Sequence, residues 1–201
     1  MLRRAETAGE RCGGPVLLAG LVLGLGVVEL SSGALGQTSR FSLELLILLV
    51  LQLVGPMLVT LIAMALLLPR WLERCSKPHA DWGPTIAASA LVGALLLLLF
   101  LSAAIAGGVL ASPRADLIAE VAEISRDLML TDLLRSTLRA AVFLVVLCGW
   151  SLLRGRRRLR RNIAPALVSS DLMVEGLTLL LGLKLFWITA IDPLHLSASA
   201  P

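Results

Sequence analysis

Runs of apolar residues long enough to cross a bilayer recur about five times along the chain, and this pattern constrains the fold more than any other feature. A helix needs about 20 such residues to span the hydrocarbon core. Of the 201 residues 57% are hydrophobic and only 16% are charged, so the charged shell of a soluble domain is missing. Helices satisfy every backbone group inside lipid. We therefore predict an all-α polytopic membrane protein, with residues 1–201 forming a single membrane domain.

Polar or proline-containing breaks separate the expected spans. The spans cover about residues 15–30, 43–68, 84–111, 134–153 and 172–191. Between the third and fourth spans, residues 114–132 repeat apolar side chains every three or four positions. That spacing predicts an amphipathic helix lying outside, on the membrane surface or on the bundle. The second and third spans are joined by a loop of about fifteen residues, Pro69 to Gly83.

Basic residues in the short loops predict the orientation. With a cytoplasmic N-terminus, the inner segments hold twelve Lys and Arg residues and the outer segments hold four. The N-terminus is therefore predicted to be cytoplasmic and the C-terminus to lie outside. Cys12, Cys75 and Cys148 then fall on or near the cytoplasmic side, where thiols stay reduced. The first apolar run also fits a cleavable signal peptide, although Glu29 near its end argues against cleavage.

The sequence contains no recognisable catalytic or metal-binding pattern. His79 and His195 have no partner at metal-ligand spacing, and the motifs of serine hydrolases, zinc proteases and P-loop ATPases are missing. We expect no catalytic residue, no metal and no cofactor. Lys184 is the deepest ionisable residue in a span, which makes it a candidate functional residue by default. A structural role, through a partner on another helix or through snorkelling, is favoured over transport because no second deep charge suggests an ion path.

Small residues and one proline mark where helices can approach or bend. The Gly20-x-x-x-Gly24 spacing and the Gly107-Gly108 pair permit close helix packing. The Gly55-Pro56 pair falls in the middle of the second expected span, where proline removes a backbone hydrogen bond and bends the helix. A tolerated kink without a function explains this pair equally well.

A run of arginines follows the fourth span. It consists of Arg154, Arg156, Arg157, Arg158, Arg160 and Arg161. We predict that the run fixes the topology and binds anionic headgroups, at about 1 kcal/mol per basic residue. No aromatic residues are interleaved to stack bases, so nucleic-acid binding is not expected.

Four segments carry a family resemblance through their order. They are Pro15-Val16-Leu17-Leu18-Ala19-Gly20-Leu21-Val22-Leu23-Gly24, then Leu51-Gln52-Leu53-Val54-Gly55-Pro56-Met57-Leu58, then Pro84 and Ala87 with Gly107-Gly108, and last Asp132-Leu133-Leu134 with Arg139, Val142-Phe143 and Ala166-Leu167-Val168-Ser169-Ser170. This order resembles the P-x-V-L-L-x-G-L-x-x-G, L-R-E-L-G-P-V-L, G-G and D-L-L…K-x-x-V-F…A-V-V-x-S segments of the MlaE/YrbE family. These proteins are the permease subunits of bacterial ABC systems that move phospholipids with MCE-domain proteins.

The resemblance implies a permease-like subunit of the bacterial inner membrane that handles membrane lipids. It also implies a homo- or heterodimer of permeases around a lipid path, with ATPase subunits below and an MCE assembly above. The candidate ATPase-docking residues, all in the inner loop, are Arg70, Trp71, Glu73 and Arg74. The family's Arg-Glu pair corresponds to Gln52 and Leu53, and its coupling loop is shortened here. A non-transporting scaffold or assembly factor that keeps the permease fold therefore remains the alternative.

Overall fold

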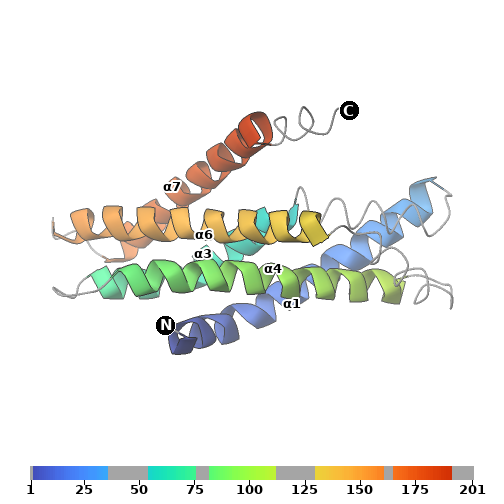
Figure 1. The fold of residues 1–201 in the computed structure, drawn as a ribbon, viewed down its shortest axis with the longest axis horizontal. Helices are drawn as coiled ribbons and strands as arrows, with labels where there is room; N and C mark the ends of the chain where they lie inside the picture. Colours follow the sequence, from blue (N-terminus) through green and yellow to red (C-terminus); the bar gives the residue numbers. More distant parts are fainter. Residues whose placement is uncertain (1, 36–53, 76–81, 112–129, 161–164, 192–201) are drawn as a thin grey trace.

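Five long helices make up the described part of the computed structural model, which covers residues 2–35, 54–75, 82–111, 130–160 and 165–191. They are α1 (Leu2–Leu35), α3 (Gly55–Cys75), α4 (Gly83–Ala111), α6 (Leu130–Leu159) and α7 (Pro165–Phe186), with a π-helical turn η2 (Trp187–Ile191) continuing α7 (Figure 1). Each long helix contains a stretch apolar and long enough to cross a membrane. The predicted fold class is confirmed: the chain is an all-α, multi-pass membrane protein.

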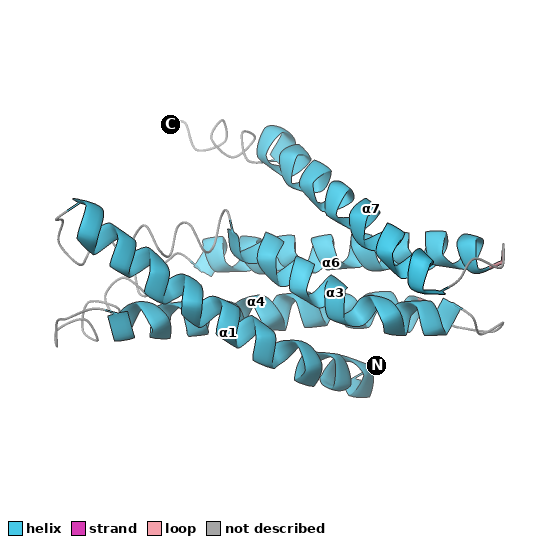
Figure 2. Ribbon diagram, turned by 180° about the vertical axis from the view of Figure 1, so that it is seen from behind, coloured by secondary structure: helices cyan, strands magenta, loops and turns pink. Residues whose placement is uncertain are grey.

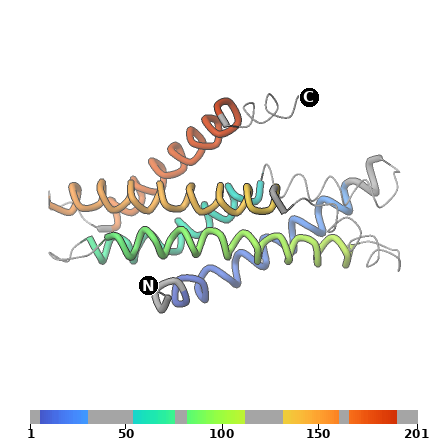
Figure 3. Tube along the Cα trace, viewed as in Figure 1, coloured from blue at the N-terminus to red at the C-terminus, as the bar shows by residue number. Residues whose placement is uncertain are grey.

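Successive helices alternate in direction, so the basic segments gather at one end of the bundle (Figure 3). Arg70 on α3 donates from Nη1 to the carbonyl oxygen of Thr7 on α1, at 3.4 Å. The Arg156 guanidinium on α6 lies 5.3 Å from the ring centroid of Trp82, directly before α4. We call this end, formed by the starts of α1, α4 and α7 and the ends of α3 and α6, the basic end. It is the end predicted to face the cytoplasm.

Helices α4 and α6 occupy the centre of the bundle. α4 packs against α1, α3 and α6, and α6 packs also against α3 and α7. Figure 2 shows α1 crossing α4 at an angle and α7 diverging from α6. Large side chains with no exposed surface fill the core: Met64, Leu97, Phe100, Phe143, Leu144 and Leu147. The apolar stretch of α7 is only 28% buried, against 50% for α4, so α7 turns most of its side chains toward lipid.

α3 extends further toward the basic end than the sequence predicts. The pattern predicts a span that stops at Pro69, but α3 continues through this proline to Cys75. Proline costs the helix a backbone hydrogen bond, yet its fixed φ fits helical geometry. The added turns bury Trp71, Leu72 and Cys75, and this burial compensates for the lost bond. Residues 69–75 of the predicted loop are therefore part of α3.

The arginine run is helical from Arg154 to Arg158, in contrast to the prediction. The pattern ends the fourth span at Leu153 and places the run in a loop, whereas α6 continues to Leu159. Arginine is a good helix former, and cations are favoured near a helix C-terminus. Two other helices are also longer than predicted. α1 extends beyond the predicted span at both ends, and α7 begins at Pro165 rather than near residue 172.

Two predictions lie wholly or partly outside the described residues. Residues 114–129 of the predicted amphipathic segment and residues 43–53 of the second span are not among them. Gly55-Pro56 opens α3 as described, and Thr60 Oγ1 donates to the Pro56 carbonyl oxygen at 2.5 Å. The bend predicted at this pair therefore falls at the edge of the described residues.

Reporter fusions can check the orientation. With the basic end in the cytoplasm, alkaline phosphatase should be active when fused to the C-terminus and inactive when inserted within residues 76–81, because only the former site would be translocated. Green fluorescent protein, which matures in the cytoplasm, should give the opposite pattern. If both reporters reported the reverse, the predicted orientation would be wrong.

Candidate functional site

The two glycine motifs meet where α1 crosses α4. A Cβ atom built on Gly20 would lie 2.5 Å from the Phe100 carbonyl oxygen, and one on Gly24 would lie 2.0 Å from the Ala104 carbonyl oxygen. From the facing helix, a Cβ on Gly107 would lie 2.3 Å from the carbonyl oxygen of Leu21. Such distances show that the two backbones touch, which only glycine allows. The structure thus brings Gly20, Gly24 and Gly107 into one contact, beside the Gly108 nitrogen.

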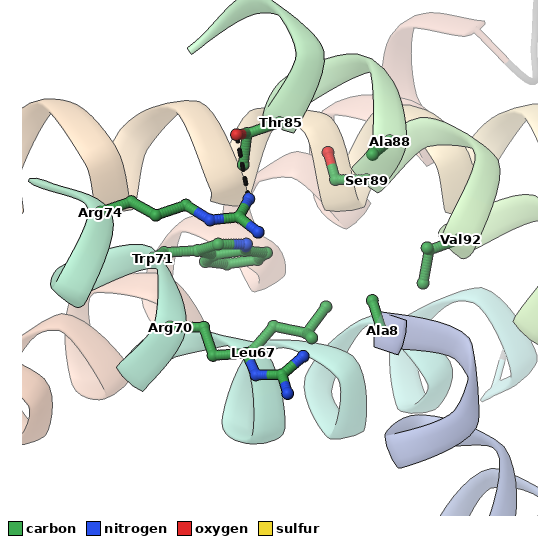
Figure 4. A pocket seen from close by; sticks show the side chains of 9 residues that line it. All are labelled: Ala8, Leu67, Arg70, Trp71, Arg74, Thr85, Ala88, Ser89 and Val92. Atoms are coloured by element: carbon green, nitrogen blue, oxygen red, sulfur yellow. Dashed lines mark hydrogen bonds between the residues drawn. The ribbon is translucent and has the colours of Figure 1, made fainter. Parts of the chain in front are cut away.

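A crevice between α1, α3 and α4 lies at the basic end and contains most of the predicted docking residues (Figure 4). Its lining consists of Ala8, Leu67, Arg70, Trp71, Arg74, Thr85, Ala88, Ser89 and Val92. Glu73, the fourth predicted docking residue, is exposed and is not part of the lining. Trp71 is only 4% exposed, so its ring packs inside the chain and is not offered to a partner.

Polar contacts fix the two arginines of the crevice. Arg74 donates from Nη1 to Thr85 Oγ1 at 3.0 Å, which ties α3 to α4. Arg70 is bonded to the Thr7 carbonyl oxygen as described above, which ties α3 to α1. The cavity measures about 30 Å³, enough for one or two water molecules. A whole phospholipid cannot enter it, because pockets for small organic ligands start at roughly 300 Å³.

The arginine run divides into side chains that pair within the protein and side chains that face outward. Arg158 pairs with two carboxylates of α7, through Nη1 to Asp171 Oδ2 at 2.6 Å and through Nη2 to Glu175 Oε1. Arg154 Nε lies 3.9 Å from Glu175 Oε2. The sequence prediction of headgroup binding did not anticipate this link between α6 and α7. The sequence contains a signal for this link that was missed. Arg154 and Arg158 are four residues apart, as are Asp171 and Glu175, so each of these two pairs lies on one face of its helix.

The other arginines of the run have different surroundings. Arg154 and Arg156 also lie over aromatic rings, at 4.9 Å from the Trp150 centroid and 5.3 Å from the Trp82 centroid. Arg157 and Arg160 are exposed, and Arg161 lies outside the described residues. Within the described part of the run, Arg157 and Arg160 are thus the arginines best placed to reach lipid headgroups.

A buried polar cluster lies toward the opposite end of α6 and α7. Arg139 is 4% exposed and its guanidinium lies 5.2 Å from the ring centroid of Trp187, while the Phe143 ring meets the same indole edge-on at 5.9 Å. Lys184, one turn before Trp187, is 7% exposed. Neither cation is isolated, and the structural role expected for Lys184 stays a prediction. The sequence placed Arg139 near a span end but did not reveal that two buried cations share one region.

No metal-binding group occurs in the described part of the chain, where no three His, Cys, Asp or Glu side chains lie close enough together. His79 and His195 are outside the described residues. The three cysteines, Cys12, Cys75 and Cys148, are buried free thiols. Cys75 Sγ donates to the Leu152 carbonyl oxygen at 3.5 Å, so this thiol helps to join α3 to α6.

Comparison of the chain with protein-family models, with curated proteins and with solved structures finds no match.

Proposed function

We propose that the chain is a permease-like membrane subunit of a bacterial ABC-type phospholipid transport system of the inner membrane. The observation that supports this most is that segments carrying the family resemblance pack on each other. The glycines of the first segment contact the backbone around Gly107 and Gly108 of the third. Two helices approach this closely only when both carry small residues at the contact, which gives a physical reason for the presence of both glycine motifs in one chain.

The last segment of the resemblance adds support. Arg139 and Phe143 belong to it, and both meet Trp187 of η2. Buried cations in membrane spans are costly and are retained mainly where they serve a purpose.

Transport in this proposal requires partner chains. The crevice at the basic end is far too small for a lipid. The lipid path would therefore run between this chain and a second permease, identical or different. An ATPase would bind at the basic end and an MCE-domain protein at the other end.

A second candidate, a non-transporting scaffold or assembly factor, is favoured by one observation. Of the predicted docking residues, Trp71 is buried, Arg70 and Arg74 line the crevice, and Glu73 is the exposed one. Among the described residues of the predicted inner loop, this leaves little surface for an ATPase to bind. A chain with the permease fold and a weak ATPase contact would serve assembly rather than transport.

Deletion and co-purification test the proposed function. A transport subunit should co-purify with an ATPase and an MCE-domain protein, and its deletion should change the phospholipid distribution between membranes. Glu73→Arg should then break the ATPase contact, whereas Arg157→Glu, also at an exposed position of the basic end, should leave it intact. A normal lipid distribution in the deletion strain, with neither partner recovered, would rule out transport. Recovery of other partners with normal lipids would favour the scaffold.

A further inference from the structure

Two charged side chains of α1 face outward at a depth where the bundle surface is otherwise apolar. Glu10 and Arg11 are exposed. Just before them, Ala8 lines the crevice beside α3 and α4 (Figure 4). Just after them, a Cβ atom built on Gly13 would lie 3.7 Å from Cδ2 of Leu99, near the middle of the 29-residue helix α4. The charged pair therefore lies level with the apolar part of α4.

Lipid is a poor environment for this pair. The outward-facing side chains of α4 at this level are leucines: Leu91, Leu95 and Leu98. A charged side chain that faces hydrocarbon is costly. Arg11 can extend toward the headgroups, but the Glu10 side chain is shorter and reaches less far. Adjacent residues of a helix do not face each other, so the two charges cannot pair within one chain. Within the described residues neither side chain has a hydrogen bond or an ion pair, so a polar group from another chain would stabilise this face.

Two rows of residues at four-residue spacing lie on opposite faces of α1. The inner row contains Gly20 and Gly24 and packs on α4. The outer row is exposed and consists of Glu6, Glu10, Gly14, Leu18 and Val22. A Cβ atom built on Gly14 meets nothing within 4 Å in the described part of the chain. Rows at this spacing interdigitate when two helices cross, and a glycine lets the backbones approach. The outer row thus has the form of a second helix-packing face.

We propose that the outer row of α1 binds the outer row of a second copy of this chain. Two copies inserted in the same direction are related by a two-fold axis along the membrane normal, so their α1 helices run parallel in an isologous contact. Across this axis Glu10 of each copy pairs with Arg11 of the other, which neutralises all four charges. Gly14, one turn deeper, lies at the closest approach, and Leu18 continues the contact with apolar surface.

Charge complementarity is the reason for assigning a second copy to this face. An unrelated membrane helix would need both an acidic and a basic residue at this one depth, whereas a second copy carries them there by symmetry. The contact goes beyond the proposed function, because a transport subunit and a scaffold could both self-associate. Its test uses the purified full-length chain and needs neither an ATPase nor an MCE-domain protein. Failure of the transport proposal would leave the contact untouched, and the reverse also holds.

Charge reversals test the pairing between copies. Two differently tagged copies are co-expressed and purified in mild detergent through one tag, and the recovery of the other tag is measured. Glu10→Arg in both copies, or Arg11→Glu in both copies, places like charges together and should lower this recovery on the order of tenfold. Combining the two substitutions in one chain restores opposite charges and should restore the recovery. A Glu10→Arg copy mixed with an Arg11→Glu copy should also associate, because each contact then joins an arginine to a glutamate.

The mixture separates a second copy from any other partner, since only contact between copies predicts its recovery. Unchanged recovery with the single reversals, or low recovery with the mixture, would overturn the proposal.

Disulfide crosslinking locates the contact without altering its charges. Gly14→Cys should give a disulfide-linked dimer when membranes are oxidised, and the unmodified chain, whose three cysteines are buried, provides the background. The matched control is Leu181→Cys, at a half-exposed position of α7, which Figures 1 and 2 show on the other side of the bundle from α1. This variant should stay at background. Equal dimer from the two variants, or none from Gly14→Cys, would contradict the contact. Crosslinks from Gly14→Cys to a different protein alone would mean that the second copy is the wrong partner.

Discussion

Replacing Gly24 with alanine should destabilise the protein markedly. The added methyl group would lie 2.0 Å from the Ala104 carbonyl oxygen and 2.9 Å from the Gly108 nitrogen, far inside van der Waals contact. Backbone atoms of two helices cannot move aside as a flexible side chain can, so α1 must shift away from α4. We expect a loss of about 1–3 kcal/mol for Gly24→Ala and failure to accumulate in the membrane for Gly24→Leu. Thermal unfolding of the purified protein in mild detergent measures the first effect.

Gly26 supplies the control for this prediction. It lies on the same helix two positions further on, and nothing comes within 4 Å of a Cβ built there. Gly26→Ala makes the same change in helix propensity without the clash, so it should leave the melting temperature unchanged or raise it slightly. If the two alanine variants melted at the same temperature, the close approach of α1 and α4 would not be a feature of the protein in detergent.

Reversing the charge of Arg158 should separate α7 from α6 at the basic end. Its guanidinium holds Asp171 and Glu175, and the Glu175 side chain is only 28% exposed, so the interaction is partly shielded from water. Hydrogen bonds to charged groups of this kind contribute about 1.5–3 kcal/mol. Arg158→Gln should lose a contribution of this size, and Arg158→Glu should lose more because three carboxylates would then meet. Protease sensitivity around residues 161–164 and the melting temperature both report the effect.

Two further variants isolate the pairing from the charge. Arg157→Glu makes the same reversal at the neighbouring exposed position and should be close to neutral. Combining Arg158→Glu with Glu175→Arg restores an opposite-charge pair and should recover part of the lost stability. Equal destabilisation by the two single reversals would mean that net charge at the basic end matters and the specific pair does not.

The fold class and the glycine contact are predictable from the sequence because both follow from local rules. A long apolar run in lipid has few alternatives to a helix. The Gly20-x-x-x-Gly24 spacing predicts a face without side chains, and such a face is useful only where another backbone approaches. The sequence did not identify the partner, however. Gly107 and Gly108 lie two spans further along, and only the tertiary arrangement selects α4 for this contact.

The ends of the helices could not be predicted because local and tertiary effects compete there. Pro69 and the arginine run both signal the end of a span, since proline breaks helices and charges avoid lipid. Both segments remain helical because their side chains find partners elsewhere in the bundle. Trp71 and Leu72 enter the core, and Arg158 reaches the acidic side chains of α7. These partners lie elsewhere in the sequence, so the residues next to Pro69 or within the arginine run do not reveal where the helix ends.

The arrangement of the candidate site could not be predicted from the local sequence either. Its residues were identified from charge and loop position, which predict exposure. In the structure Trp71 is buried and Arg70 and Arg74 line the crevice, because α3 extends past Pro69 and this segment packs against α1 and α4. The same local sequence is thus compatible with an exposed docking surface and with an inward-facing crevice.

The contact between α1 and α4 also sets an order of events during synthesis. Gly24 is made more than 80 residues before Gly108. At about 5–20 residues per second, this corresponds to a delay of about 4 to 17 s. During that interval the glycine face of α1 has no α4 to cover it, and any other membrane helix with a small-residue face can occupy it. Slow translation between these two spans would lengthen that exposure and should lower the yield of correctly assembled protein.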